Sequence, residues 1–363
     1  MKQKILFIVN HEIVIYNFRK ELVRKLLDEN YDVYICSPPG KKINYLVEQG
    51  CKFIEMNVDR HGTNPLADLL LIYKYVKIIN EVKPLAVLTY TIKPNIYGAI
   101  ACRITKTHCL ANITGLGSAV ENPGIMQKIT MTLYHIGFKH IDMVYFQNQE
   151  NLDFFKIHFK KMPQYQLLPG SGVNLQEFTP LEYPDDSVIR FVFISRIMKE
   201  KGIDQYLEAA KAIKEKYQNT EFHICGFCEE EYEEVLQEYE KQGIIKYHGL
   251  IDDVREILKI THCTIHPTYY PEGMSNVLLE SCACARPIIT TDRSGCREIV
   301  DDGINGFVVK QKDDKDLIKK TIMFIDLMYD KKKEFALNAR KKIAVSFDRN
   351  IIINEYLKII KKF

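Results

Sequence analysis

The sequence predicts an α/β chain built from two doubly wound parallel sheets. Short apolar runs of strand length alternate with helical segments along nearly all of its 363 residues. The alternation starts a second time after the stretch richest in Gly and Pro, residues 169–184. A chain of this length can hold two domains, each with its own core. We therefore expect two similar halves that meet near residue 178.

The first half opens on five apolar residues, 5–9, which are typical of a strand buried on both faces. We expect a loop over residues 10–17 and a helix over 18–30, because its leucines and Val23 share one face. Further strands are expected at residues 32–36, 53–56, 86–89, 109–113 and 143–146.

The second set of strands makes the same architecture begin again. These strands are expected at residues 166–169, 190–194, 221–225, 245–248, 264–266 and 287–290. The domains would then be residues 1–178 and 179–345. A last helix over 350–362 carries an apolar face of Ile352, Ile353, Tyr356, Leu357 and Ile360.

Composition excludes several classes of protein. Hydrophobic residues make up 46% and charged residues 27%, which is typical of soluble globular chains. The net charge of +3 is too small to indicate nucleic acid as a partner. Ten cysteines without a secretory leader fit a reducing cytoplasm, and no apolar run approaches a membrane span. We expect a cytoplasmic chain that would lie on a membrane rather than cross it.

Two glutamates, Glu272 and Glu280, lie eight positions apart across a turn and a helix start. Ser275 or Asn276 can cap the helix expected over residues 277–284. The N-terminus of such a helix favours a bound diphosphate, and a helix carboxylate such as Glu280 can accept both hydroxyls of a ribose. Diol and phosphate together indicate a nucleotide.

A basic segment, residues 195–204, follows the strand expected at 190–194 and precedes a helix. Arg196 and Lys201 would project from the carboxyl end of that strand, where doubly wound folds bind ligands. Two cations there can hold a diphosphate and neutralise the charge that develops when it leaves. The alternative is a solvated basic turn, since the lysines stand among glutamates.

These motifs together resemble family 4 of the retaining glycosyltransferases of the GT-B fold. The resemblance rests on the paired glutamates, on Arg-x4-Lys-Gly-Ile at 196–203, and on the segments at 271–273, 286–292 and 302–307. It covers nearly the whole chain. It implies two Rossmann-like domains facing a central cleft, an acceptor domain over 1–178 and a nucleotide-sugar donor domain over 179–345. A returning segment, 346–363, would pack on the first domain.

The resemblance also implies roles for the donor-side residues. Arg196 and Lys201 would contact the donor diphosphate, Glu280 the ribose, and Glu272 the hydroxyls of the donor sugar. Backbone amides of Gly273, Met274, Ser275 and Asn276 would meet the sugar and the distal phosphate. The turn of His248, Gly249, Leu250 and Ile251 would lie beside the base. No metal or cofactor is needed in this scheme, because cations and the helix dipole replace it. We interpret Asp314-x-Asp316 as a helix cap rather than a metal site.

The acceptor side is open to more than one interpretation. His11 lies where many family members have a Gly-Gly pair, so it either touches a sugar or has no role. Two segments after strand-like runs are also placed in the cleft; they contain Lys93 and Asn95, and Thr114, Gly115 and Gly117.

Residues 124–146 combine Met, aromatic and basic side chains, and a short basic run, Lys156 to Lys161, follows. Packing of an ordinary helix explains the apolar part, and contact with a membrane surface or a lipid acceptor is the alternative. The basic run favours an anionic lipid.

We therefore predict an enzyme, a retaining hexosyltransferase. It would move a hexose or N-acetylhexosamine from a nucleotide-diphosphate sugar, UDP first, to a glycan acceptor linked to a polyprenyl diphosphate. The product would be capsule, exopolysaccharide or lipid-linked oligosaccharide, made at the cytoplasmic face of the inner membrane. The alternatives are a GT-B sugar-nucleotide epimerase, a phosphorylase and a non-catalytic sugar-nucleotide-binding scaffold. No Gly-x-Gly-x-x-Gly follows the first strand, which argues against an oxidoreductase.

Ala285 departs from the family, which usually has glycine at this position. If the backbone there has a positive φ, alanine costs roughly 1 kcal/mol of stability.

Overall fold

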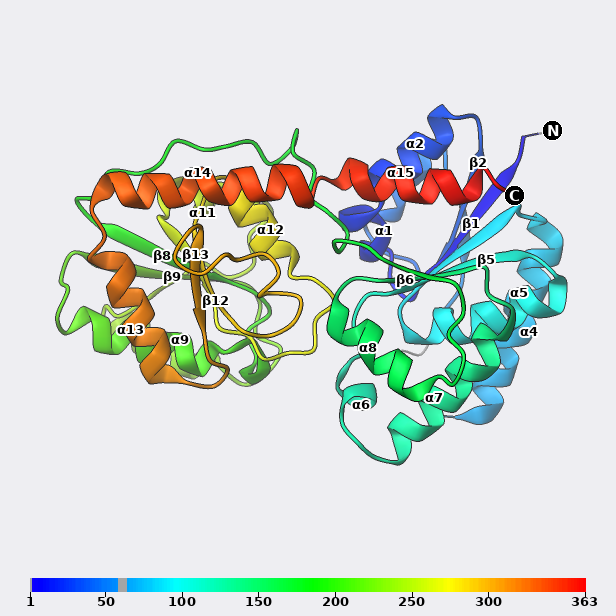
Figure 1. Cartoon of the computed structure of the whole chain (residues 1–363), viewed down its shortest axis with the longest axis horizontal. Helices are drawn as coiled ribbons and strands as arrows, with labels where there is room; N and C mark the ends of the chain where they lie inside the picture. Colours follow the sequence, from blue (N-terminus) through cyan, green and yellow to red (C-terminus); the bar gives the residue numbers. More distant parts are fainter. Residues whose placement is uncertain (1, 58–63) are drawn as a thin grey trace. The chain divides into compact units, whose positions relative to one another are not determined.

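The computed structural model describes residues 2–57 and 64–363 and contains two compact units (Figure 1). The first unit comprises residues 1–171, 272–274 and 350–363, and the second comprises 172–271 and 275–349. The chain leaves the first unit between Ser171 and Gly172, inside the Gly/Pro-rich stretch and before the boundary expected at residue 178.

The first unit is built on a parallel sheet of seven strands in the order β3-β2-β1-β4-β5-β6-β7. The strands are β1 (Lys4–Ile8), β2 (Asp32–Ser37), β3 (Lys52–Glu55), β4 (Ala86–Tyr90), β5 (His108–Ile113), β6 (Met143–Phe146) and β7 (Tyr165–Leu167). The expected strands are thus confirmed. The strand near 166, which we grouped with the second set, pairs with β6 and completes the first sheet.

Helices cover both faces of this sheet (Figure 1). They are α1 (Ile13–Phe18), α2 (Lys20–Asp28), α3 (Ile43–Glu48), α4 (Pro65–Val82), η1 (Pro94–Gly98), α5 (Ala99–Thr105), α6 (Ser118–Glu121), α7 (Ile125–Gly137), η2 (Phe138–His140), α8 (Gln149–His158) and α15 (Arg349–Ile360).

The loop expected over residues 10–17 is wrong, because most of it forms helix α1. Its residues are largely β-branched and have weak helix propensity. Burial of Ile15 in the core outweighs that preference, and Nδ1 of His11 accepts the N–H of Ile13 at the helix start. The backbone breaks at Arg19 (φ −138°) before α2 begins.

The last helix packs on the first unit, as expected. Its apolar face joins the core that β1 and α2 form on one side of the sheet, and Figure 1 shows α15 beside α1 and α2. The five residues of this face predicted from the sequence, Ile352, Ile353, Tyr356, Leu357 and Ile360, are all buried there.

The second unit repeats the architecture with six parallel strands in the order β10-β9-β8-β11-β12-β13. The strands are β8 (Ile189–Ile194), β9 (Thr220–Cys225), β10 (Lys246–Tyr247), β11 (Cys263–His266), β12 (Ile288–Thr291) and β13 (Gly306–Val309). Only β13 was not expected. The helical segments are η3 (Lys199–Lys201), α9 (Ile203–Lys214), α10 (Glu233–Lys241), α11 (Val254–Ile260), α12 (Asn276–Ala283), α13 (Asp314–Ile325) and α14 (Tyr329–Ser346).

Aspartates cap α11 and α13, whereas the side chain of Ser275 at the N-cap of α12 makes no capping hydrogen bond. Asp253 caps α11 by accepting the N–H of Arg255. At α13 the capping residue is Asp313, which accepts the N–H of Asp316, so the cap lies one residue before the predicted Asp314. The Asp316 carboxylate in turn accepts the N–H of Lys310. The hydrogen bonds of Asp313 and Asp316 are those of an ordinary helix N-terminus.

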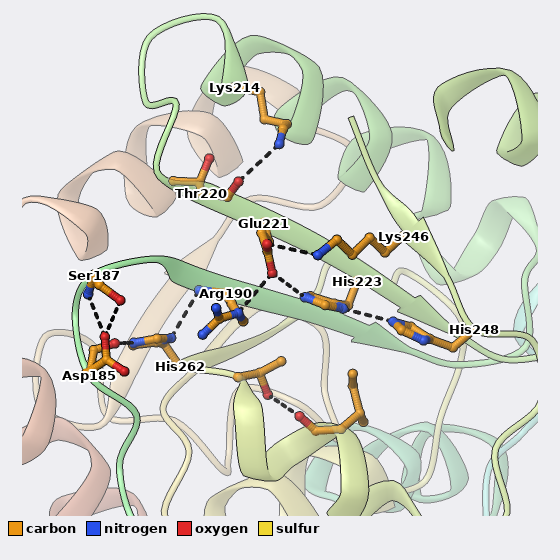
Figure 2. A network of polar contacts seen from close by, with 12 residues as sticks. Asp185, Ser187, Arg190, Lys214, Thr220, Glu221, His223, Lys246, His248 and His262 are labelled. Carbon is orange, nitrogen blue, oxygen red and sulfur yellow. Dashed lines mark hydrogen bonds and ion pairs between the residues drawn. The ribbon is translucent and has the colours of Figure 1, made fainter. Parts of the chain in front are cut away.

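His262 directly precedes β11 and is a buried neutral histidine beside the start of β8. Its Nδ1 accepts the N–H of Arg190 (3.0 Å) and its Nε2 donates to the carbonyl oxygen of Asp185 (2.9 Å), so both nitrogens are used (Figure 2). Burial lowers its pKa to about 4.

This low pKa makes the fold sensitive to acid. The unfolded chain takes up a proton at His262 near pH 6.5 and the folded chain only near pH 4, so protonation favours unfolding between these values. We expect the free energy of unfolding to decrease as the pH is lowered from 6.5 to 4. His262 should contribute up to about 1.4 kcal/mol of this decrease per pH unit. His262→Gln can keep one acceptor and one donor and should make that slope shallower. Urea unfolding at several pH values measures it, and an unchanged slope would contradict the assignment.

Ala285 follows α12 in the left-handed region, with φ of +56°. The positive φ considered from the sequence is therefore present. A glycine at this position would relieve the strain and so stabilise the folded state by about 1–2 kcal/mol. Glycine also gives the unfolded chain more conformational freedom, which offsets about 0.4–1 kcal/mol of that gain.

We expect Ala285→Gly to raise the free energy of unfolding by up to about 1 kcal/mol. Ala283→Gly, in the last turn of the same helix, is the matched control and should lower it by about 1 kcal/mol. Chemical denaturation of both variants decides the question, and a destabilised Ala285→Gly would show that the left-handed residue carries no strain.

Candidate functional site

The basic segment of the second unit lies at the carboxyl edge of its sheet. Strands β9, β8 and β11 are neighbours and run parallel, so the loops that follow them meet at one edge. The loop after β8 contains Arg196 and Lys201, and the loop after β11 contains Tyr269 and Tyr270. The N–H of Tyr269 donates to the carbonyl oxygen of Glu200 (2.9 Å), which fastens these two loops together.

Arg196 and Lys201 converge on one aromatic ring. The Lys201 ammonium lies 4.5 Å and the Arg196 guanidinium carbon 5.4 Å from the ring centre of Tyr270. Lys201 is buried, and Arg196 also forms an ion pair with Glu229 from the loop after β9. Burial alone would lower the pKa of Arg196, but Glu229 and Tyr270 together raise it above its usual value. The ring and the carboxylate therefore hold two cations in place at this edge.

Two glycines allow these loops to approach so closely. Gly202 has φ of +81°, and a Cβ there would lie 2.2 Å from the carbonyl oxygen of Pro267. At Gly226 a Cβ would lie 1.7 Å from the carbonyl oxygen of Ser195. The N–H of Gly226 donates to the carbonyl oxygen of Gly249 (2.8 Å), which links the β8 and β9 loops to the turn after β10.

That turn contains the residues expected beside the nucleotide base. Gly249 has φ of +65°, Leu250 is 73% exposed and Ile251 is half-buried. An exposed leucine at the ligand edge of a sheet offers an apolar surface to a planar ring.

A histidine pair anchors the turn to the sheet (Figure 2). Nε2 of His248 and Nδ1 of His223 are 2.9 Å apart, and the two rings stack. His223 in turn lies 3.4 Å from Glu221, a carboxylate that also pairs with Arg190 and Lys246. Burial, and then the neighbouring His248, lower the pKa of His223 to about 4, so the pair is neutral near pH 7. Burial also lowers the pKa of His248.

The start of α12 contains the other expected donor residues. Ser275 occupies the N-cap position, is buried, and its N–H donates to the carbonyl oxygen of Gly295 (2.8 Å). Its hydroxyl has no hydrogen-bond partner among the residues that the structure describes. Met274 is buried, and Asn276 and Glu280 are half-buried. A helix start with an unsatisfied buried hydroxyl is typical of a site that a polar ligand completes.

Glu272, Gly273 and Met274 group with the first unit by their contacts, whereas Glu280 belongs to the second. Glu272 is half-buried. Its predicted role toward the donor sugar stays a prediction.

Candidate acceptor residues of the first unit have different surroundings. His11 is one-third exposed, and its Nδ1 lies 2.7 Å from a carboxylate oxygen of the buried Glu12. Lys93 pairs with Asp68 (3.0 Å). Asn95 is buried, accepts a hydrogen bond from Thr89 and donates one to the carbonyl oxygen of Asn112, so its amide holds two strand ends together. Contact of these residues with an acceptor remains a prediction.

The other predicted segment of this unit is a partly exposed loop after β5. Thr114 and Gly115 follow the strand directly, and Gly115 (φ +137°) and Gly117 (φ +69°) both have positive φ. The carbonyl oxygen of Gly117 accepts the first hydrogen bonds of α6.

Sequence reasoning missed Tyr270 and Glu229, the two direct partners of Arg196. Tyr270 stands two residues before Glu272, so it was inside the motif we examined, but an aromatic residue in a loop carries no signal of its own. Glu229 is one of several glutamates in its segment. Both contacts follow from the strand order, which the sequence alone does not give.

Comparison with known proteins places both units in one class of enzyme. The family model described as glycosyl transferases group 1 matches residues 181–342, and the one described as glycosyl transferase 4-like matches residues 4–148.

Two curated relatives align along nearly their full length. A Campylobacter jejuni N,N'-diacetylbacillosaminyl-diphospho-undecaprenol alpha-1,3-N-acetylgalactosaminyltransferase is 26% identical, with 95% of each chain covered. The capsular polysaccharide biosynthesis glycosyltransferase CapM of Staphylococcus aureus is 24% identical, with 98% of this chain and 95% of CapM covered.

Solved structures share the fold. A glycosyltransferase from Rickettsia africae superposes with a TM-score of 0.83 at 20% identity, covering 99% of this chain and 98% of that one. Anabaena HepE, solved in complex with UDP and glucose, has a TM-score of 0.81 at 16% identity, covering 99% and 100%. Across residues 2–57 and 64–363, no helix has the length and apolar character required to span a bilayer. The chain is a glycosyltransferase of the GT-B fold, in which the first unit matches the 4-like family model and the second the group 1 model.

Proposed function

We propose that this glycosyltransferase moves a hexose or N-acetylhexosamine from a UDP-sugar to a glycan acceptor carried on a polyprenyl diphosphate. The observation that carries the proposal is the convergence of Arg196 and Lys201 on Tyr270 at the ligand edge of the second sheet. The names of two relatives support the acceptor class, since one acts on a diphospho-undecaprenol sugar and the other in capsular polysaccharide biosynthesis. The pathway would be the synthesis of a surface glycan.

In this proposal each donor-site residue has one task. Arg196 and Lys201 bind the diphosphate, and the buried hydroxyl of Ser275 donates to the phosphate or sugar at the start of α12. The Glu280 carboxylate accepts the hydroxyls of the ribose. Residues 249–251 lie beside the base, and Leu250 provides its apolar contact.

The chemistry that fits this arrangement is departure of the diphosphate and attack by an acceptor hydroxyl on the same face of the sugar, which retains the anomeric configuration. The bond from the anomeric carbon to the diphosphate oxygen breaks, and a bond to the acceptor oxygen forms. The acceptor proton passes to the leaving diphosphate. Arg196 and Lys201 stabilise the charge that develops on this group, so no metal ion is required.

In this proposal Arg196 turns from a carboxylate to the diphosphate. In the structure its guanidinium is paired with Glu229. A diphosphate carries more negative charge than one carboxylate and presents several acceptor oxygens, so it competes effectively for the guanidinium. Glu229 is exposed and loses little when water replaces the arginine.

Titration calorimetry with UDP, GDP and UDP-sugars, in the presence of a metal chelator, tests the donor site. We expect UDP to bind, and Arg196→Ala, Lys201→Ala and Glu280→Ala each to weaken it by about 10–100-fold, because each removes a charge-assisted contact. Two controls match these changes. Lys199→Ala removes an exposed lysine of the same segment, and Glu256→Ala removes an exposed glutamate of helix α11. Both should bind UDP as the wild type does.

Absence of nucleotide binding by a folded protein would refute the donor site. Binding without transfer to any lipid-linked acceptor would favour a scaffold, and conversion of the sugar nucleotide without an acceptor would favour an epimerase.

The stereochemistry of transfer is a separate prediction. Proton NMR of the first product should show an α-linkage from an α-linked UDP-sugar, as front-face attack requires. A β-linked product would refute the retaining mechanism while leaving the donor site intact.

A further inference from the structure

We propose that the first unit carries a docking surface for an anionic lipid layer where helices α7 and α8 end. A cavity of about 620 Å³ opens there, and five of its lining residues are basic: His135, Lys139, His158, Lys160 and Lys161. No acidic side chain lines it. The inference concerns a surface of the first unit and stands apart from the donor site; its connection to a lipid-linked acceptor rests on the proposed function.

Aromatic packing between the two helices forms the cavity. The His135 ring of α7 stacks on Phe159, which follows α8, at 3.9 Å with an interplanar angle of 5°. Tyr134 packs edge-on against Phe155 (5.1 Å) beneath this pair. The chain then continues through Lys160 and Lys161, which also line the cavity. The basic side chains are therefore carried on a rigid base.

These cations are not neutralised by the protein. Lys139, Lys160 and Lys161 are exposed. Within the described ranges, their side chains take part in no hydrogen bond or ion pair. The two histidines use Nδ1 inside their own helices, where it donates to the carbonyl oxygens of Met131 and Phe154 (both 2.8 Å). With Nδ1 donating, Nε2 of the neutral ring is an acceptor, so the cations of this cavity are the three lysines. A cavity with several uncompensated cations is complementary to phosphate groups.

Exposed isoleucines adjoin the two cavity histidines in sequence, and one more lies on a neighbouring helix. Ile136 on α7 is 44% exposed, Ile157 on α8 is 82% exposed and Ile104 on α5 is 57% exposed. Ile104 and Ile136 belong to neighbouring helices, since the guanidinium of Arg103 donates to the carbonyl oxygen of Ile136 (3.2 Å). Farther along α7, Ile125 and Ile129 are exposed as well, at spacings that put them on the face of Ile136.

The basic character continues across η2 into a second cavity of about 400 Å³. Arg103, Lys106 and His140 are among its lining residues, and its one carboxylate, Asp142, is engaged by His108 and by the backbone N–H of Cys109. The two cavities lie on either side of one short helical turn, because Lys139 lines the first and His140 the second. Together they form one cationic surface.

The combination of features identifies the occupant as a lipid surface. A free phosphate would be bound by the cations alone and would not need exposed isoleucines. A lipid headgroup layer offers phosphates to the cations and an acyl boundary to the apolar side chains, which is the pattern of interfacial helices. Lysines near an anionic bilayer each strengthen binding by about fivefold.

Vesicle co-sedimentation of the whole protein tests the surface. We expect binding to vesicles that contain phosphatidylglycerol and much weaker binding to phosphatidylcholine alone. The triple variant Lys139→Ala, Lys160→Ala, Lys161→Ala should bind the anionic vesicles on the order of 100-fold more weakly. Ile136→Ser with Ile157→Ser should also weaken binding. The matched control is Lys211→Ala, Lys216→Ala, Lys241→Ala, which removes the same charge from exposed positions of the second unit and should bind as the wild type.

Titration with UDP verifies that every variant is folded and separates the two proposals. If the control triple variant lost as much binding to anionic vesicles, the effect would be one of general charge and the inference would be overturned. If the triple lysine variant lost vesicle binding but the double isoleucine variant did not, only a site for soluble anions would remain. That result would also overturn the docking surface. A protein that binds UDP but no vesicle keeps the proposed donor site and loses this surface.

Discussion

The buried guanidinium of Arg286 is the interaction on which the arrangement of the second unit depends. It has no exposed surface, and all its hydrogen bonds go to carbonyl oxygens. Nε donates to Leu258 in α11, Nη2 to Glu182 in the entering segment, and Nη1 to Ala285 after α12, at 2.7, 2.7 and 2.9 Å. Burial lowers its pKa to about 10, so it still carries its charge near pH 7. One cation thus ties together three segments that would otherwise end in unsatisfied carbonyl groups. The turn that begins β12, and with it the position of α12, follows from this arrangement.

The parts of the fold that were predictable are those in which local pattern and final burial agree. Runs such as residues 5–9 and 190–194 became central strands because continuous apolar stretches fit only a strand covered on both faces. The face of α15 was also visible in the sequence. Helix α1 was missed because its β-branched residues favour extended structure and only the tertiary burial of Ile15 makes it helical. Strand order is a property of the whole sheet, so the contact of Arg196 with Glu229 had no local signal.

The candidate donor site shows the same division. Arg196, Lys201 and Glu280 were predicted from residue type, spacing and the family resemblance, and their contact with a donor stays a prediction. The stacked pair of His223 and His248 was not predicted, since it depends on the parallel pairing of β9 and β10, in which Lys246 lies opposite His223.

The two groups of cations in the molecule also differ physically. Those of the second unit are already held by an aromatic ring and a carboxylate, which lowers the entropic cost of binding a defined ligand. The lysines at the ends of α7 and α8 have no such side-chain partner among the described residues, as suits a fluid and variable surface.

The place of α15 in the first core constrains how the chain acquires its structure during synthesis. Tyr356 packs against Tyr145 and hydrogen-bonds to Asn112, so strands made early are covered by residues that are made late. When residues 1–171 have emerged from the ribosome, one face of their sheet still lacks this cover. The second unit, apart from the short segment 272–274, is contiguous in sequence and can complete its own core first. The core of the first unit is thus complete only when the residues of α15 have been made, whereas the core of the second unit does not include them.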